Sequence, residues 1–101
     1  NSIKYINEHF TENIDLKKLA DIEHYNVSYY SEWFKHNMNL SPIEYIQNLR
    51  IKKAKELLLN TNLTILQISQ IIGYEHNSSF TRVFKHLEKI SPAEFRKTIK
   101  K

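Results

Sequence analysis

The sequence contains no cysteine, a single glycine and only two prolines. The lack of cysteine excludes a disulfide scaffold and a cysteine-based zinc site, and it fits a reducing cytoplasm. So few turn-forming residues argue against an all-β fold. No apolar run approaches the roughly 18 residues of a membrane span, and no signal peptide opens the chain, so we expect no membrane partner. The 101 residues, 41% of them hydrophobic, predict a single compact helical domain.

The net charge of +4 is spread unevenly along the chain. Residues 1–81 carry 8 basic and 9 acidic side chains, a net of −1, whereas residues 82–101 carry 7 basic and 2 acidic side chains, a net of +5. A basic end suits nucleic acid, although a solvated lysine tail gives the same pattern. Charge alone therefore favours DNA only slightly.

An internal repeat organises the sequence. FKHNMNLSPIEYI, from Phe34, matches FKHLEKISPAEFR, from Phe84, at an offset of 50 residues. Upstream the likeness is looser, with Leu19-Ala20 in the place of Ile68-Ser69. Self-similarity at one spacing predicts two copies of one supersecondary unit.

Helix-start signals recur in both copies. Ser41-Pro42-Ile43-Glu44 and Ser91-Pro92-Ala93-Glu94 place serine at the N-cap, proline at the first helical position and glutamate at the third. Thr64 and Gln67 predict another capping box, Gly73 a left-handed helix stop, and Asp15 an N-cap. The predicted helices span residues 2–10, 15–23, 27–37, 42–60, 65–72, 77–87 and 92–99. Short helices joined by three or four residues are typical of a helix-turn-helix.

The third and sixth predicted helices each have an apolar and a polar face. Tyr30, Trp33 and Phe34 in one helix, and Phe80 and Phe84 in the other, recur at helical spacing and are interpreted as core. The opposite faces carry residues that can hydrogen-bond to base edges or reach phosphates. These residues are Ser28, Tyr29, Ser31, Glu32 and Lys35 in the third helix and Asn77, Ser78, Ser79, Thr81, Arg82 and Lys85 in the sixth. Polarity alone is more typical of an ordinary solvated helix face than of base contact.

The long helix predicted over residues 42–60 would measure about 28 Å at 1.5 Å per residue. This length is close to the roughly 34 Å between successive major-groove entries on one face of B-DNA. The helix could therefore be a spacer between two reading heads, an amphipathic helix that ties two subdomains together, or both. The expected division of the domain, residues 1–101, is a first helix-turn-helix unit over 1–40, a linker helix over 41–61 and a second unit over 62–101.

Many fixed positions carry a family resemblance. They include Tyr45, LRIKKAKELL from Leu49, Ile65, Ile68, Ile72-Gly73-Tyr74, Phe80, Arg82, Phe84-Lys85, Ser91-Pro92 and Phe95-Arg96. With these residues the whole chain resembles the C-terminal DNA-binding domain of the AraC/XylS family of bacterial transcription regulators. The resemblance implies an all-α fold of seven helices, forming two helix-turn-helix subdomains joined by a long linker helix. It also implies that the third and sixth helices enter consecutive major grooves. The family's base-reading positions fall on Ser28, Ser31, Glu32, Asn77, Ser78, Ser79 and Arg82.

A few positions depart from the family pattern. Asn39 and Lys89 stand where glycine is usual; asparagine tolerates a left-handed backbone, whereas lysine there costs about 1 kcal/mol or requires another turn. Ser69 replaces the usual alanine and keeps the small size. Glu32 stands where a basic or polar residue is common, so it either reads cytosine or repels phosphate.

Three other functions are alternatives to DNA binding: catalysis, protein interaction and RNA binding. No two of the five histidines lie three or four residues apart, so they form no zinc motif, and nothing meets the geometric requirements of a catalytic site. We therefore expect neither an enzyme nor a cofactor or metal. A helical protein-interaction module, using Tyr29 and the basic last helix, remains an alternative. RNA binding is disfavoured because the major groove of A-form RNA is too narrow for a helix.

The sequence thus predicts a cytoplasmic bacterial domain that binds double-stranded DNA. Phosphate contacts are expected from Lys35, Lys85, the helix starts and Arg50. Because the chain does not begin with methionine and opens inside a helical pattern, we expect it to be part of a longer protein. Further expected partners are RNA polymerase and an N-terminal sensor or dimerisation domain in the parent protein.

Overall fold

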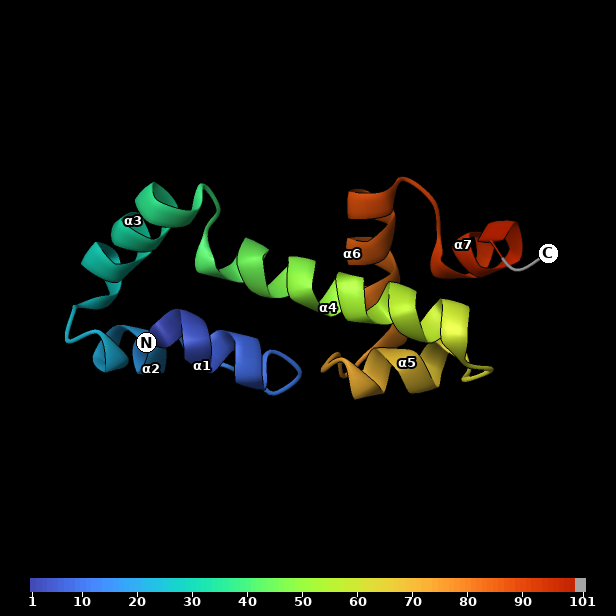
Figure 1. Ribbon diagram of the computed structural model, residues 1–101, viewed down its shortest axis with the longest axis horizontal. Helices are drawn as coiled ribbons and strands as arrows, with labels where there is room; N and C mark the ends of the chain where they lie inside the picture. The colour runs from blue at the N-terminus through green and yellow to red at the C-terminus, as the bar shows by residue number, and fades with distance from the viewer. Residues whose placement is uncertain (100–101) are drawn as a thin grey trace. The chain divides into compact units, whose positions relative to one another are not determined.

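The computed structural model describes residues 1–99 and shows seven helices (Figure 1). They are α1 (Ser2–His9), α2 (Leu16–Ile22), α3 (Val27–Met38), α4 (Pro42–Asn60), α5 (Ile65–Ile71), α6 (Asn77–Glu88) and α7 (Pro92–Ile99). Over the described residues there is no strand. The predicted all-α fold is confirmed, and no predicted helix end is displaced by more than one residue.

The predicted helix caps are present. Ser41 and Glu44 exchange hydrogen bonds, with the Glu44 N–H donating to Ser41 Oγ at 3.1 Å and the Ser41 N–H donating to Glu44 Oε1 at 2.9 Å. Ser91 and Glu94 repeat this arrangement before α7, as do Thr64 and Gln67 before α5. The Asp15 side chain accepts from the Lys17 N–H and caps α2. These local contacts fix where the helices begin.

The chain divides into a first unit, Asn1–Leu49, and a second unit, Arg50–Lys101. The division falls inside α4, so the long helix contributes side chains to both cores. In the first unit Tyr45, Ile46 and Leu49 of α4 pack against buried residues of α1, α2 and α3, which are Ile6, Leu19, Ala20, Tyr30 and Phe34. The second core combines α4, α5 and α6 and contains Ile51, Ala54, Leu58, Ile68, Ile72, Phe80 and Phe84.

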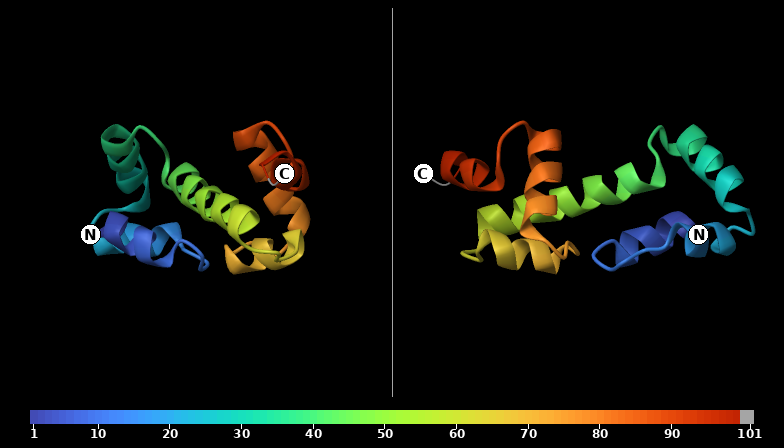
Figure 2. Two further views of the ribbon diagram at one scale, coloured as in Figure 1. Left: turned by 45° about the vertical axis from the view of Figure 1, so that its right-hand side comes forward. Right: turned by 180° about the vertical axis from the view of Figure 1, so that it is seen from behind.

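Each unit contains a helix-turn-helix, formed by α2 and α3 in one case and by α5 and α6 in the other. Each of the two turns contains an equivalent backbone hydrogen bond. The Tyr25 N–H donates to the Ala20 carbonyl oxygen, and the Tyr74 N–H donates to the Ser69 carbonyl oxygen, both at 2.9 Å. Ala20 and Ser69 are fully buried, which explains why both positions hold small residues. Within the second unit α6 crosses the later turns of α4 (Figures 1 and 2).

Left-handed residues complete the turns and helix ends. Gly73 has φ 105°, as expected for the predicted stop, and His24 adopts φ 63° in the first turn. Asn39 and Lys89 end α3 and α6 with φ 62° and 71°. Lys89 therefore takes the left-handed conformation at the position where the resembled family usually has glycine. This conformation costs energy because the Cβ atom of lysine lies close to the following carbonyl oxygen.

Candidate nucleic-acid interface

Helix α3 is held in the first unit by its apolar face. Tyr30 and Phe34 are fully buried, and the Tyr30 hydroxyl donates to Ser2 Oγ at 3.0 Å. The Ser2 N–H in turn donates to a Glu23 carboxylate oxygen at 2.8 Å, which lowers the pKa of Glu23, while burial raises the pKa of Tyr30. This chain of hydrogen bonds joins α3 to α1 and to the end of α2. It was not predicted, because the sequence does not show that Ser2 and Tyr30 meet.

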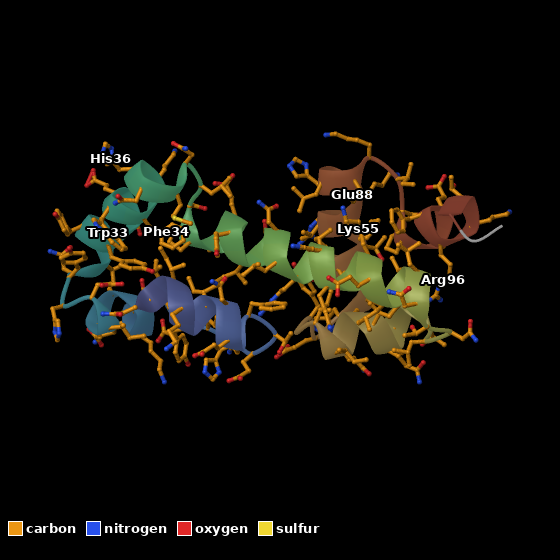
Figure 3. The ribbon with its side chains drawn as sticks, in the orientation of Figure 1. Trp33, Phe34, His36, Lys55, Glu88 and Arg96 are labelled. Atoms are coloured by element: carbon orange, nitrogen blue, oxygen red, sulfur yellow. The ribbon has the colours of Figure 1, made fainter. Side chains whose placement is uncertain are left out.

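Helix α6 is held in the second unit by Phe80 and Phe84, both fully buried, and by an ion pair. Lys55 Nζ of α4 lies 3.3 Å from the Glu88 carboxylate at the end of α6, and Figure 3 shows the two side chains together. Both side chains are partly buried, so the pair is better shielded from water than a typical surface pair. It fastens the last turn of α6 to α4.

With their apolar faces buried, α3 and α6 turn the predicted contact residues outward. Ser28, Glu32 and Lys35 are exposed at i, i+4 and i+7 on α3, and Ser31 beside them is partly exposed. On α6 the same arrangement holds: Asn77, Ser78, Arg82 and Lys85 are exposed, and Ser79 is partly exposed. Ser28, Glu32 and Lys35 thus form a polar stripe on α3, and Ser78, Arg82 and Lys85 form one on α6. Ser31, Asn77 and Ser79 lie at the edges of these stripes.

The two helices begin differently. The Asn26 side chain accepts from the Tyr29 N–H at 2.8 Å and caps α3. His76, at the start of α6, makes no side-chain hydrogen bond to the first turn. The backbone N–H groups at the start of α6 therefore lack a side-chain acceptor, and such groups suit an anion.

Arg50, predicted to contact phosphate, has partners inside the second unit. Its guanidinium carbon lies 5.0 Å from the centre of the Tyr74 ring, and one terminal nitrogen donates to the Gly73 carbonyl oxygen at 3.4 Å. Burial raises the pKa of Tyr74, and the positive charge of Arg50 opposes that rise. In this position Arg50 supports the turn between α5 and α6, and its phosphate contact stays a prediction.

Arg96 of α7 has a structural role that the sequence did not reveal. Its guanidinium donates to the carbonyl oxygens of Leu58, Thr61 and Leu63, at 3.1, 3.2 and 2.6 Å. Figure 3 shows Arg96 beside the end of α4. The arginine thereby satisfies carbonyl groups at the helix end and in the segment that leads to α5. Its place in the Phe95-Arg96 motif was the only signal in the sequence.

No group of three or more histidine, aspartate or glutamate side chains in residues 1–99 is placed to hold a metal ion. Among the helices that the structure describes, none is both long and apolar enough to cross a membrane.

Comparison with known proteins identifies the family. A family model described as a helix-turn-helix domain matches residues 19–98. The HTH-type transcriptional regulator YobQ of Bacillus subtilis, itself uncharacterized, is 43% identical over 98 residues, which make up 97% of this chain and 41% of YobQ. The C-terminal domain of AraT, a response regulator from Geobacillus stearothermophilus, is 32% identical with a TM-score of 0.90, over 96% of this chain and 81% of that one. The chain belongs to the AraC/XylS family.

The AraC/XylS assignment covers the fold as well as the sequence. The DNA-binding domain of AdpA, solved in complex with a target DNA, has a TM-score of 0.90 over 96% of this chain and 87% of that one. At 18% identity this likeness shows the fold alone. The chain is thus an AraC-type helix-turn-helix DNA-binding domain, and it spans less than half the length of YobQ.

Proposed function

We propose that this AraC-type domain binds double-stranded DNA in a sequence-specific way, as part of a bacterial transcription regulator in the cytoplasm. Helices α3 and α6 enter adjacent major grooves. The observation that carries the proposal is the repeated outward stripe, Ser28, Glu32 and Lys35 on one helix and Ser78, Arg82 and Lys85 on the other. An α-helix fits into the major groove of B-DNA, where each base pair presents its own pattern of donors and acceptors.

Each outward residue has a role that follows from its chemistry. Arg82 donates in bidentate fashion to guanine, and Asn77 pairs with adenine. The hydroxyls of Ser28, Ser31, Ser78 and Ser79 can bond to several bases, and Glu32 accepts from an exocyclic amine. Lys35, Lys85, the start of α6 and, secondarily, Arg50 contact phosphates and fix the register.

The unbroken helix α4, with its 19 residues, supports use of two grooves. At 1.5 Å per residue it measures about 28 Å, near the pitch of B-DNA. We expect the two recognised segments to lie about 10 base pairs apart. In the parent protein we expect an N-terminal sensor or dimerisation domain, and we expect the regulator to contact RNA polymerase.

Selection of binding sites from randomised duplexes, followed by titration of Arg82→Ala, tests the proposal. We expect the variant to lose about 1–3 kcal/mol of binding free energy and to relax preference at one base pair. Lys85→Ala should weaken all sequences alike and reduce the salt slope by about 1. Lys4→Ala, which removes an exposed positive charge from α1, is the control and should change neither quantity by much.

Two results would count against the proposal. If Arg82→Ala keeps the affinity and the selectivity of the parent chain, Arg82 does not read a base. If the unaltered domain selects no sequence, and its affinity for duplex does not fall as salt rises, the domain is instead a protein-interaction module.

A further inference from the structure

The two units differ sharply in charge. Counted from the sequence, the first unit, residues 1–49, carries 4 basic and 7 acidic side chains, a net of −3. The second unit, residues 50–101, carries 11 basic and 4 acidic side chains, a net of +7. A polyanion attracts the second unit and repels the first one. The first unit therefore needs a compensating contact wherever its helix enters a groove.

The difference in charge extends to α3 and α6, the two helices proposed to enter the major grooves. At the repeat offset of 50 residues, Glu32 of α3 occupies the position that Arg82 holds in α6. Both side chains are exposed, and neither forms an ion pair within residues 1–99. Among the ion pairs of the described residues there is none between Glu32 and Lys35, which lies one turn further along α3. An unpaired negative charge thus stands in the middle of the first polar stripe.

A carboxylate at this position can be satisfied by few partners in a major groove. It has only acceptor oxygens, so guanine O6 and N7 and thymine O4 oppose it. Adenine offers an amine, but its N7 acceptor lies beside that amine. Cytosine presents its N4 amine as a donor without an acceptor on the same base edge. Of the four bases, cytosine therefore suits Glu32 best.

We propose that Glu32 is a selectivity residue that admits α3 only where a cytosine amine lies opposite it, and that it rejects other bases by leaving a carboxylate unpaired. The inference rests on the proposed function, because it requires α3 to enter the groove. It assigns the first unit a role different from that of the second: Arg82 adds attraction to DNA at its position, whereas Glu32 withholds binding from unsuitable sequences. Specificity by repulsion of this kind needs no gain in total affinity.

The test compares Glu32→Ala with the parent chain on a set of duplexes. One duplex carries the selected site, and the others replace the single C·G pair opposite α3 with each other pair. We expect the parent chain to prefer the cytosine duplex by tenfold or more, on the order of what one good base contact gives. Glu32→Ala should bind the replaced duplexes more tightly than the parent chain does, so that the preference falls to about twofold or less.

Glu8→Ala is the matched control. Glu8 is exposed on α1, so its removal makes the same change in net charge in the same unit without altering α3. We expect it to shift the affinity for all the duplexes by one common factor. If Glu32→Ala does the same, Glu32 acts only as a general repulsive charge and the inference is overturned. It is overturned equally if Glu32→Ala leaves every affinity unchanged.

A change in the DNA tests the contribution of the cytosine N4 amine alone. In the selected duplex the cytosine is replaced by 2-pyrimidinone, which lacks the exocyclic amine, and the parent chain and Glu32→Ala are compared. We expect the parent chain to lose several-fold more affinity than the variant; equal losses would contradict the inference. Failure of the parent chain to bind any duplex would instead refute the proposed function, so the two failures are distinguishable.

Discussion

The first and second units share one design for folding and differ in the residues that they expose. Both use a Ser-Pro-x-Glu capping box, a pair of buried aromatic rings in the second helix of the helix-turn-helix and an equivalent hydrogen bond across the turn. They differ at Glu32 and Arg82, and in how α3 and α6 are held to their neighbours. Many residues that repeat at the fixed offset are ones that the fold requires, such as Phe34 and Phe84 in the two cores. Ser28 and Ser78, like Lys35 and Lys85, also repeat but are exposed. The two exposed stripes differ in charge at Glu32 and Arg82.

The contacts that hold α3 and α6 differ in kind. In the first unit the hydrogen-bonded chain from Tyr30 through Ser2 to Glu23 ties α3 to its neighbours. In the second unit the position equivalent to Tyr30 is Phe80, which has no hydroxyl, and the polar tie between α6 and α4 is the Lys55–Glu88 ion pair. The tie of α6 therefore depends on the positive charge of Lys55, whereas the tie of α3 uses hydrogen bonds from a hydroxyl and a backbone N–H.

The largest expected effect is that of Arg96→Ala, which removes three hydrogen bonds from the second unit. The carbonyl groups left without their charged donor should reduce the free energy of unfolding by about 2–4 kcal/mol. Urea unfolding followed by circular dichroism measures the change. Arg96→Lys keeps the charge but lacks the planar fork, so it should recover only a small part of the loss. A loss below about 1 kcal/mol in Arg96→Ala would show that water replaces the guanidinium.

A smaller effect of the opposite sign on the free energy of unfolding is expected at the C-terminal ends of α3 and α6. Lys89 has φ 71° and Asn39 has φ 62°, and glycine adopts such angles without strain. Lys89→Gly should therefore stabilise the protein by about 0.5–1 kcal/mol. Asn39→Gly should gain less, because asparagine already tolerates the left-handed region. Thermal unfolding of the two variants checks the order; equal gains, or a loss at Lys89, would contradict this account of strain.

Much of the fold could be predicted from the sequence because its determinants are local. Capping boxes, proline at the first helical position and helical spacing of aromatic residues act within a few positions of one another, and they located most of the helices. The outward stripes followed from the same periodicity. The roles of Ser2 and Arg96 could not be predicted, since their partners lie 21 or more residues away in the sequence. Arg50 shows the same limit, because only the three-dimensional structure reveals the Tyr74 ring beneath its guanidinium.

The smallest expected difference between the two units is in their loss of stability at low pH. In the first unit a backbone N–H from Ser2 lowers the pKa of Glu23, and one from Ser41 lowers the pKa of Glu44. Among the described residues of the second unit, only Glu94 has a pKa lowered in this way, by the Ser91 N–H. A carboxyl group whose pKa is lower in the folded state stabilises that state above its ordinary pKa, and the stabilisation is lost as the pH falls through the folded-state pKa. The second unit's other capping box uses Gln67, which does not titrate.

We therefore expect the first unit to lose structure at a higher pH than the second during acidification below about pH 4.5, the ordinary value for these carboxyl groups. The single tryptophan, Trp33, reports on the first unit by fluorescence, and the amide signal of the single glycine, Gly73, reports on the second by NMR. Glu23→Gln should shift the Trp33 transition and leave the Gly73 transition in place. If the two probes change together at every pH, the acid-sensitive carboxylates do not act within their own units, and the contrast drawn between the units fails for stability.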